Sequence, residues 1–218
     1  MKTPVNARTL KQHLTYNFWK YLLIAAVAFG LVSLLYPMTE HHSPADKKVE
    51  FFVYGVMDEQ GLTEYMSTVM QSEMSDMEVM APRLLLDDGN YGPMQLVTYM
   101  AVGEGDLYLL PKDEFVSVAS SGGLVPLEDD TELMDFFNGA GIQLQSGWRR
   151  NTETGETHLY GIPQSKLPGL SNYAYAKDGY LCVTEMGGNV DNTRKFLRIL
   201  CRDMMSSAAS EPEPSPVP

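Results

Sequence analysis

Apolar and polar positions divide residues 48–205 into segments of two alternating kinds. Short runs rich in β-branched and aromatic residues, typical of buried strands, lie at 49–56, 77–86, 106–110, 158–162 and 180–184. Apolar spacing and helix start and stop signals predict helices at 59–74, 93–100, 112–121, around 133–137 and at 189–205. Strands that alternate with helices predict an α/β fold, a single three-layer domain whose mostly parallel sheet is covered on both faces.

A longer uncharged run stands near the N-terminus. Residues 21–36 read YLLIAAVAFGLVSLLY, and with their neighbours they give about 20 residues, enough to cross the hydrocarbon core of a bilayer. Trp19, Tyr21 and Tyr36 lie at the two ends of the run, where aromatic belts form. We therefore predict one transmembrane helix at 18–38, in contact with the lipid bilayer.

A cleaved signal peptide is the alternative interpretation of the same run. The residues at 43–45, Ser-Pro-Ala, loosely resemble the small-residue site at which such peptides are cleaved. However, the apolar run is longer than the usual signal-peptide core, and the basic region before it is long. These two lengths favour a retained anchor.

Charge is distributed unevenly along the chain. The 16 Lys and Arg residues and 28 Asp and Glu residues give a formal net charge of −12, and residues 1–36 contain no acidic residue. The acidic balance argues against nucleic acid as a partner, because proteins that bind nucleic acid need a basic surface. A basic end followed by an acidic domain predicts a single-pass protein of the cell membrane, with a cytoplasmic N-terminus and an extracytoplasmic domain.

This topology assigns a role to every part of the chain. Residues 1–17 form a cytoplasmic tail, 18–38 the transmembrane helix, and 39–47 a polar linker. Residues 48–205 form the extracytoplasmic α/β domain. The Ser/Pro/Glu-rich residues 206–218 cannot pack a core, so we expect a disordered tail.

No catalytic or metal-binding signature is present. The chain has no G-x-S-x-G, H-E-x-x-H or P-loop motif, and no Cys/His cluster accompanies Cys182 and Cys201. We therefore predict a protein that is not an enzyme and that needs no cofactor or metal. The two cysteines are either small buried residues or, in an oxidising exterior, a disulfide.

Carboxylates that stand in runs or at strand starts are expected to have structural roles. Asp87, Asp88 and the acidic residues at 128–130 fit turns and helix caps. Asp106 begins a strand that should be central, and we expect its side chain to accept a structural hydrogen bond from a neighbouring loop.

If the domain binds a small molecule, the fold class predicts where. Open parallel sheets bind ligands at the carboxyl ends of their strands. Trp148 and Tyr160 are added because aromatic side chains could stack on a sugar ring, although packing is the commoner role of such residues. The candidate ligand-binding residues are Tyr54, Gly55, Met57, Asp87, Asp88, Leu110, Pro111, Trp148 and Tyr160.

Residues 95–130 carry a family resemblance. They read QLVTYMAVGEGDLYLLPKDEFVSVASSGGLVPLEDD, with a G-x-G-D turn at 103–106 before a strand and a Leu-Glu-Asp-Asp segment at 127–130. The sequence resembles the first lobe of the extracellular solute-binding proteins of ABC importers. The opening VEFFVYG, the LYGIP at 159–163 and the closing GYLCVTEMGGNVDNTRKFLRIL are similar to features of that family.

The resemblance implies a lobe like those of periplasmic binding proteins. It also implies a non-enzymatic binding role, a sugar or peptide as solute, and an ABC transporter or another membrane protein as partner. Only about 30 residues separate the 95–130 block from LYGIP, so a full second lobe does not fit. The alternative is therefore an accessory protein of the cell envelope that keeps the lobe and binds a protein partner instead of a solute.

Overall fold

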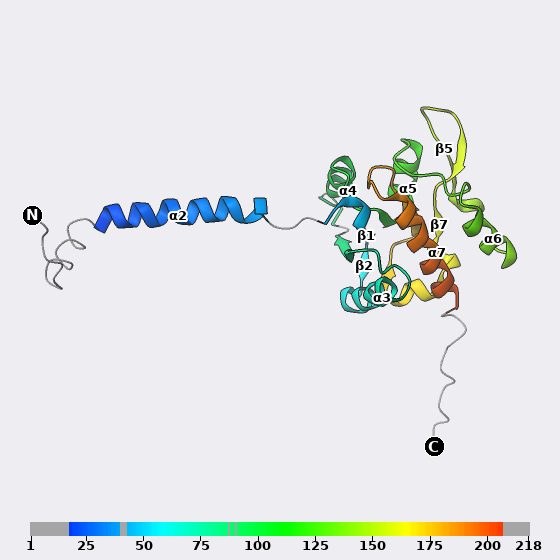
Figure 1. Ribbon diagram of the computed structural model, residues 1–218. Helices are drawn as coiled ribbons and strands as arrows, with labels where there is room; N and C mark the ends of the chain where they lie inside the picture. The colour runs from blue at the N-terminus through cyan, green and yellow to red at the C-terminus, as the bar shows by residue number, and fades with distance from the viewer. Residues whose placement is uncertain (1–17, 40–42, 87, 90, 207–218) are drawn as a thin grey trace, which may run out of the picture. The chain divides into compact units, whose positions relative to one another are not determined.

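The computed structural model describes residues 18–39, 43–86, 88, 89 and 91–206 (Figure 1). The chain divides into two units, residues 1–42 and 43–218, and each is described by itself. The predicted cytoplasmic tail, residues 207–218 of the predicted C-terminal tail, and the candidate Asp87 lie outside the described residues.

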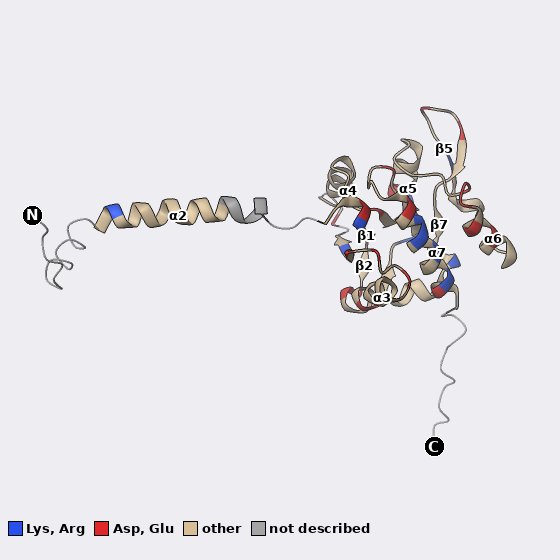
Figure 2. Ribbon diagram, viewed as in Figure 1, with Lys and Arg blue, Asp and Glu red and all other residues tan. Residues whose placement is uncertain are grey.

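The N-terminal unit contains one helix, α2 (Phe18–Thr39), over the span predicted to cross the membrane. Its residues from Phe18 to Ser33 are exposed, apart from the half-buried Gly30. Lys20 is the one charged residue of the helix (Figure 2). Among the residues that the structure describes, no helix is both long and apolar enough to cross a membrane.

A five-stranded sheet in the order β3-β1-β4-β9-β7 forms the centre of the second unit. Strands β3 (Val79–Leu85) and β4 (Leu107–Leu110) pair in parallel with β1 (Lys48–Tyr54). Strand β9 (Tyr180–Val183) is antiparallel to both β4 and β7 (Ile162–Pro163). Strands β3, β1, β4 and β7 therefore run in one direction and β9 runs against them, so the sheet of the predicted α/β fold is mixed.

The connections between strands explain this mixture. Helix α3 (Glu59–Ser72) carries the chain from β1 to β3, and α4 (Tyr91–Ala101) carries it from β3 to β4, so these strands run in parallel. The link from β7 to β9 holds only two 3-10 helices, at Gln164–Lys166 and Pro168–Asn172, and the two-residue strand β8 (Ala174–Tyr175). Without a crossover helix, the chain re-enters the sheet in the opposite direction.

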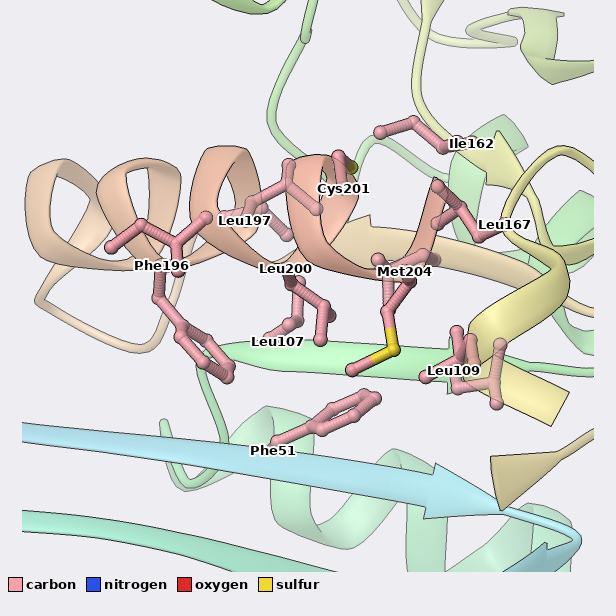
Figure 3. Packing of buried hydrophobic residues seen from close by; sticks show 14 of the residues in the cluster. Phe51, Leu107, Leu109, Ile162, Leu167, Phe196, Leu197, Leu200, Cys201 and Met204 are labelled. Carbon is pink, nitrogen blue, oxygen red and sulfur yellow. The ribbon is translucent and has the colours of Figure 1, made fainter. Parts of the chain in front are cut away.

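Alternate residues of the strands build a core on each face of the sheet, as the predicted three-layer architecture requires. On one face, Phe51, Leu107 and Leu109 pack against α3 and α7 (Val190–Ser206) (Figure 3). On the other face, Phe52 and Tyr108 pack against α4 and α5 (Lys112–Ser120). Nearly every residue of the central strands is buried, which agrees with their continuous apolar sequences.

The remaining elements are short. Helix α6 (Thr131–Gly139) leads to a hairpin of β5 (Trp148–Arg150) and β6 (Thr157–Leu159), and β2 (Val56–Met57) pairs with β8. Asp130 caps α6 by accepting a hydrogen bond from the Leu133 N–H at 3.0 Å. This confirms the capping role expected for Asp130 within the acidic run at 128–130.

The two cysteines lie on opposite faces of the sheet. Cys182 belongs to the core under α4 and α5, whereas Cys201 belongs to the core under α7. Both thiols are free and buried, and burial raises the pKa of each above its usual range. They are the small buried residues of the first alternative, not a disulfide.

Asp106 has the structural role that its place in the sequence predicted, although its hydrogen-bond donor lies in strand β1 and not in a loop. The residue is 4% exposed, and its Oδ2 accepts a hydrogen bond from the Glu50 N–H at 2.8 Å. Burial raises the pKa of the Asp106 carboxyl to about 6, because the hydrogen bond from Glu50 only partly offsets the lost solvation. The buried Asp106 carboxyl therefore changes its protonation state near pH 6, within the range in which the protein can be studied.

This pKa gives a prediction for stability as a function of pH. Because the folded pKa lies above the usual value of 3.8, the folded state holds the proton more tightly, so ionisation between about pH 4 and 6 destabilises the fold. Asp106→Asn keeps the acceptor for the Glu50 N–H and removes this titration. Between pH 4 and 7, the wild-type protein should therefore lose about 2 to 3 kcal/mol of unfolding free energy relative to the variant, at about 1.4 kcal/mol per pKa unit.

Urea unfolding of both proteins at each pH measures this difference, and other titrating groups cancel because the two proteins share them. A difference that stays constant from pH 4 to 7 would contradict the raised pKa.

Candidate functional site

The carboxyl ends of β1 and β4, where a ligand was predicted to bind, are covered by another part of the chain. Tyr54 and Leu110 are buried in the core beneath α4 and α5. A Cβ added to Gly55 would lie 2.3 Å from the Tyr175 carbonyl oxygen, so another part of the chain covers this strand end. These three candidates support the sheet and are not accessible to a ligand in this conformation.

The covering part is the 173–179 segment, which we call the strap. The Asp58 N–H donates a hydrogen bond to the Tyr173 carbonyl at 2.7 Å, and the Lys112 N–H donates one to the Lys177 carbonyl at 3.3 Å. Between these two bonds, β8 pairs with β2. The strap therefore bridges the ends of β1 and β4 and occupies the crevice that open α/β sheets use for ligands.

Two further candidate ligand-binding residues, Asp88 and Tyr160, have structural roles. Asp88 accepts hydrogen bonds from the Tyr91 N–H at 2.7 Å and the Gly92 N–H at 2.8 Å, so it caps α4. Tyr160 is 2% exposed and lies in the core beneath α5.

The other three candidates remain partly accessible. Met57 and Pro111 are half-buried, and Trp148 is 36% exposed. Met57 lies in β2, Pro111 precedes α5 and Trp148 begins β5, and the pocket beside Met57 is lined by neither Pro111 nor Trp148.

A pocket of about 260 Å³ lies beside the strap, where β7 ends and β9 begins. Because β9 is antiparallel, this is the same edge of the sheet at which the parallel strands end. We call it the Asp178 pocket. Its polar and aromatic lining comes from Ser146, Gln164, Ser165, Ser171, Tyr175 and Asp178.

Gln164 fixes the shape of this pocket. The side chain is buried, its Nε2 donates to the Ala174 carbonyl at 2.6 Å, and its Oε1 accepts from the Ala176 N–H at 3.1 Å. The Gln164 amide thus makes the hydrogen bonds that a further neighbouring strand would make. It satisfies backbone groups of the strap that would otherwise be buried without a hydrogen bond. Gln164 therefore holds the strap in place.

Asp178 and Tyr175 are the side chains available to a ligand. Asp178 has φ of 49°, a left-handed conformation that Asp tolerates, in a turn closed by the Gly179 N–H to Ala176 carbonyl bond at 3.0 Å. Tyr175 is 54% exposed at the pocket wall. A carboxylate acceptor beside an aromatic face and three serine hydroxyls can bind a small molecule rich in hydroxyl or amine donors.

These residues escaped the sequence analysis because the strap has neither helical nor strand periodicity. The available signal was the Asp-Gly pair at 178–179, a turn signature between two apolar runs. It marks a tight turn but does not say that the turn borders a pocket.

A second polar cluster lies at the hairpin. His158 Nδ1 contacts Glu128 Oε1, and Glu128 Oε2 accepts from the Leu159 N–H at 2.9 Å. The hydrogen bond with Glu128 raises the pKa of the His158 imidazole. Over the described residues, no group of three or more His, Cys, Asp or Glu side chains could hold a metal ion.

The architecture defines the class of the domain: an α/β lobe with a mixed five-stranded sheet and helices on both faces. No protein-family model matches the chain, and no curated protein matches it.

Two solved structures illustrate what the chain is similar to. One is a family 1 extracellular solute-binding protein from Alicyclobacillus acidocaldarius subsp. acidocaldarius DSM 446, with 19% identity, 56% of this chain covered and a TM-score of 0.38. The other is maltose-bound T. maritima MalE3, with 20% identity, 53% of this chain covered and a TM-score of 0.39. The matches cover only 29% and 28% of those proteins. What they bind is therefore not assigned to this chain by comparison.

Proposed function

We propose that residues 43–206 form a non-enzymatic solute-binding lobe that takes a small polar solute, of the sugar or short-peptide class, in the Asp178 pocket. The observation that carries the proposal is the convergence of Asp178, Tyr175 and the serine hydroxyls at the carboxyl edge of the sheet. The resemblance of residues 95–130 to solute-binding proteins supports the same function, and association with an ABC-type importer forms part of the proposal.

The geometry suits a weakly enclosed ligand. The pocket volume of about 260 Å³ is just below the roughly 300 Å³ at which small-molecule sites begin, so a ligand of one sugar ring or two amino acids is favoured. Its binding groups lie on one lobe, without a second lobe to close over them among the described residues. We therefore expect modest affinity.

A thermal-shift screen of the full chain in detergent micelles, against monosaccharides, disaccharides and short peptides, tests the proposal. A ligand that binds only the folded state at 100 times its Kd stabilises by about 2.7 kcal/mol, which is several degrees of melting temperature for a domain of this size. A rise that depends on ligand concentration supports solute binding. A folded protein that no compound shifts contradicts it.

The site itself is tested by Asp178→Asn. Asn tolerates the left-handed backbone, so the fold should be unaffected, while the loss of a charged acceptor should weaken binding at least tenfold, at about 1.5 to 3 kcal/mol for such a bond. Asp135→Asn, an equally conservative change at an exposed position on α6, serves as the control and should leave the affinity unchanged. Titration calorimetry with the ligand from the screen measures both, and equal affinity of the two variants would place the ligand elsewhere.

A second candidate function has an observation of its own. The strap occupies the crevice at the ends of β1 and β4, which favours an accessory protein of the cell envelope that kept the lobe and binds a protein partner. A full chain that binds no solute but co-purifies with one membrane protein would support this second candidate.

Attachment to the cell membrane through residues 18–38, with the lobe on the extracytoplasmic side, is the remaining part of the proposal. Its support is the uncharged sequence between Lys20 and Pro37 and the absence of acidic residues before residue 36. Extraction of cell membranes at high pH, compared with a variant lacking residues 18–38, tests this attachment.

A further inference from the structure

The Asp178 pocket contains one ionised side chain. Among the described residues that line it, Asp178 is the only Asp, Glu, Lys, Arg or His. Asp178 is exposed, and its carboxylate forms no hydrogen bond or ion pair with another described residue. Lys166 and Lys177 are close in sequence, but neither of them lines the pocket. The Asp178 carboxylate therefore presents an unpaired negative charge to a solute that enters.

This charge disfavours one group of solutes. An ionised carboxylate only accepts hydrogen bonds, and it repels a carboxylate or phosphate group on a ligand. The described lining offers no guanidinium, ammonium or imidazole group that could bind such an anion instead. The net charge of −12 on the chain adds to the repulsion. Solutes with an anionic group, including peptides with a free carboxylate, are therefore poor ligands for this pocket.

Tyr175 provides a second feature that favours a cation. The residue is 54% exposed at the pocket wall, and its ring stacks on no other aromatic ring of the described residues. Tyr180, the other tyrosine of the lining, is 7% exposed and stacks on Phe115 with the ring centroids 4.3 Å apart. The ring of Tyr175 is therefore the one available to a ligand. Aromatic faces attract ammonium groups, because the ring quadrupole is negative above and below the ring plane.

The remaining polar groups of the pocket suit a hydroxylated ligand. Ser146, Ser165 and Ser171 are exposed, and each hydroxyl can both donate and accept a hydrogen bond. A ligand with one ammonium group and several hydroxyls would use both parts of the lining, the anionic and aromatic part and the serine part.

We propose that the solute of the Asp178 pocket is a small hydroxylated amine of the amino-sugar class, with an ammonium group and no anionic group. This inference rests on the proposed function, because it names the class of solute that the same site takes. The ammonium group donates hydrogen bonds to the Asp178 carboxylate and contacts the Tyr175 ring, while the hydroxyls of the sugar bond to the serines.

Calorimetric titration of the full chain with matched solutes tests the inference, in micelles of a detergent without a sugar headgroup. Glucosamine and glucose differ by an ammonium group in place of one hydroxyl, and galactosamine and galactose form a second pair. The N-acetyl derivatives keep the substituent and remove its charge. The titrations are made at about pH 6, where amines are protonated and Asp carboxylates are ionised.

We expect at least one amine to bind at least about tenfold more tightly than its hydroxyl counterpart and its N-acetyl derivative, because a hydrogen bond between two charged groups is stronger than a neutral one. The affinity of the amine should fall as the salt concentration rises, because salt screens the attraction to Asp178.

Variants assign this preference to the pocket. Asp178→Asn should lower the affinity of the amine to that of its hydroxyl counterpart, because Asn has nearly the same shape without the charge. Tyr175→Leu should weaken the amine about threefold, whereas Tyr175→Phe keeps the ring and should not. Asp135→Asn, at an exposed position on α6, is again the control and should leave the preference for the amine unchanged.

The possible results separate this inference from the proposed function. A neutral sugar that binds as tightly as any amine would overturn the inference and leave solute binding in place. A preference for amines that survives Asp178→Asn would place the amine elsewhere and would also overturn it. If no solute of either kind binds the folded protein, the proposed function fails, and the inference fails with it.

Discussion

Gly147→Ala is expected to destabilise the lobe by about 3 kcal/mol or more, at or above the upper end of the 1–3 kcal/mol typical of overpacking. A Cβ at position 147 would lie less than 2 Å from the Gly161 carbonyl oxygen, a contact that no side-chain rotamer can relieve. Gly161 cannot move away, because its other side lies against the Phe115 ring. Close approach of two backbones at this point joins the hairpin to β7.

Gly139→Ala is the matched control. Gly139 is the last residue of α6, and a Cβ there would meet nothing within 4 Å. Because Ala is a better helix former than Gly, this change should be neutral or stabilise by up to about 1 kcal/mol. Chemical unfolding of the two variants beside the wild-type protein measures the contrast. Similar stabilities of the two variants would contradict the packing at Gly147.

Asp130→Ala is expected to cost about 2 to 4 kcal/mol, within the range for the loss of a helix cap together with a buried ion pair. The Asp130 side chain is 2% exposed. It accepts a hydrogen bond from the Leu133 N–H at 3.0 Å, and its two oxygens accept from Arg198 Nη1 at 2.9 and 3.0 Å. Removing it leaves the first turn of α6 without its cap and the half-buried Arg198 with a weaker partner.

Glu132, the weaker partner of Arg198, provides the control. Glu132 also pairs with Arg198, at 3.2 Å, but its side chain is 76% exposed. Exposed ion pairs contribute little, so Glu132→Ala should cost less than about 1 kcal/mol. Thermal and urea unfolding of the two single variants distinguish the roles of these carboxylates. Equal losses would show that capping and burial at Asp130 contribute nothing beyond the ion pair.

The main elements of the lobe could be predicted because their patterns are long and regular. The apolar run at 49–56 and the helical spacing at 59–74 correspond to β1 and α3, and residues 189–205 correspond to α7. The direction of β9 could not be predicted. Periodicity identifies a strand, whereas its direction depends on whether a helix crosses the sheet before it.

The site was less predictable than the fold for a related reason. The rule that ligands bind at strand ends pointed to the edge of the sheet where the Asp178 pocket lies, but it could not foresee that the strap fills the crevice beside Gly55. Tyr160 was a plausible ligand surface by type, yet it is buried in the core beneath α5. Tyr175 and Asp178 belong to a segment without a periodic pattern, so only the three-dimensional fold brings them together with Ser146.

The most direct test of the central claim is a hydrogen-exchange footprint of the full chain with the solute found in the thermal screen. If the Asp178 pocket is the binding site, amides of 163–180 and of the 145–147 turn should exchange more slowly in the presence of solute. The amides of α4 should be unaffected, because that helix lies outside the pocket. Protection confined to α4, or none at all under saturating solute, would contradict a binding site at Asp178.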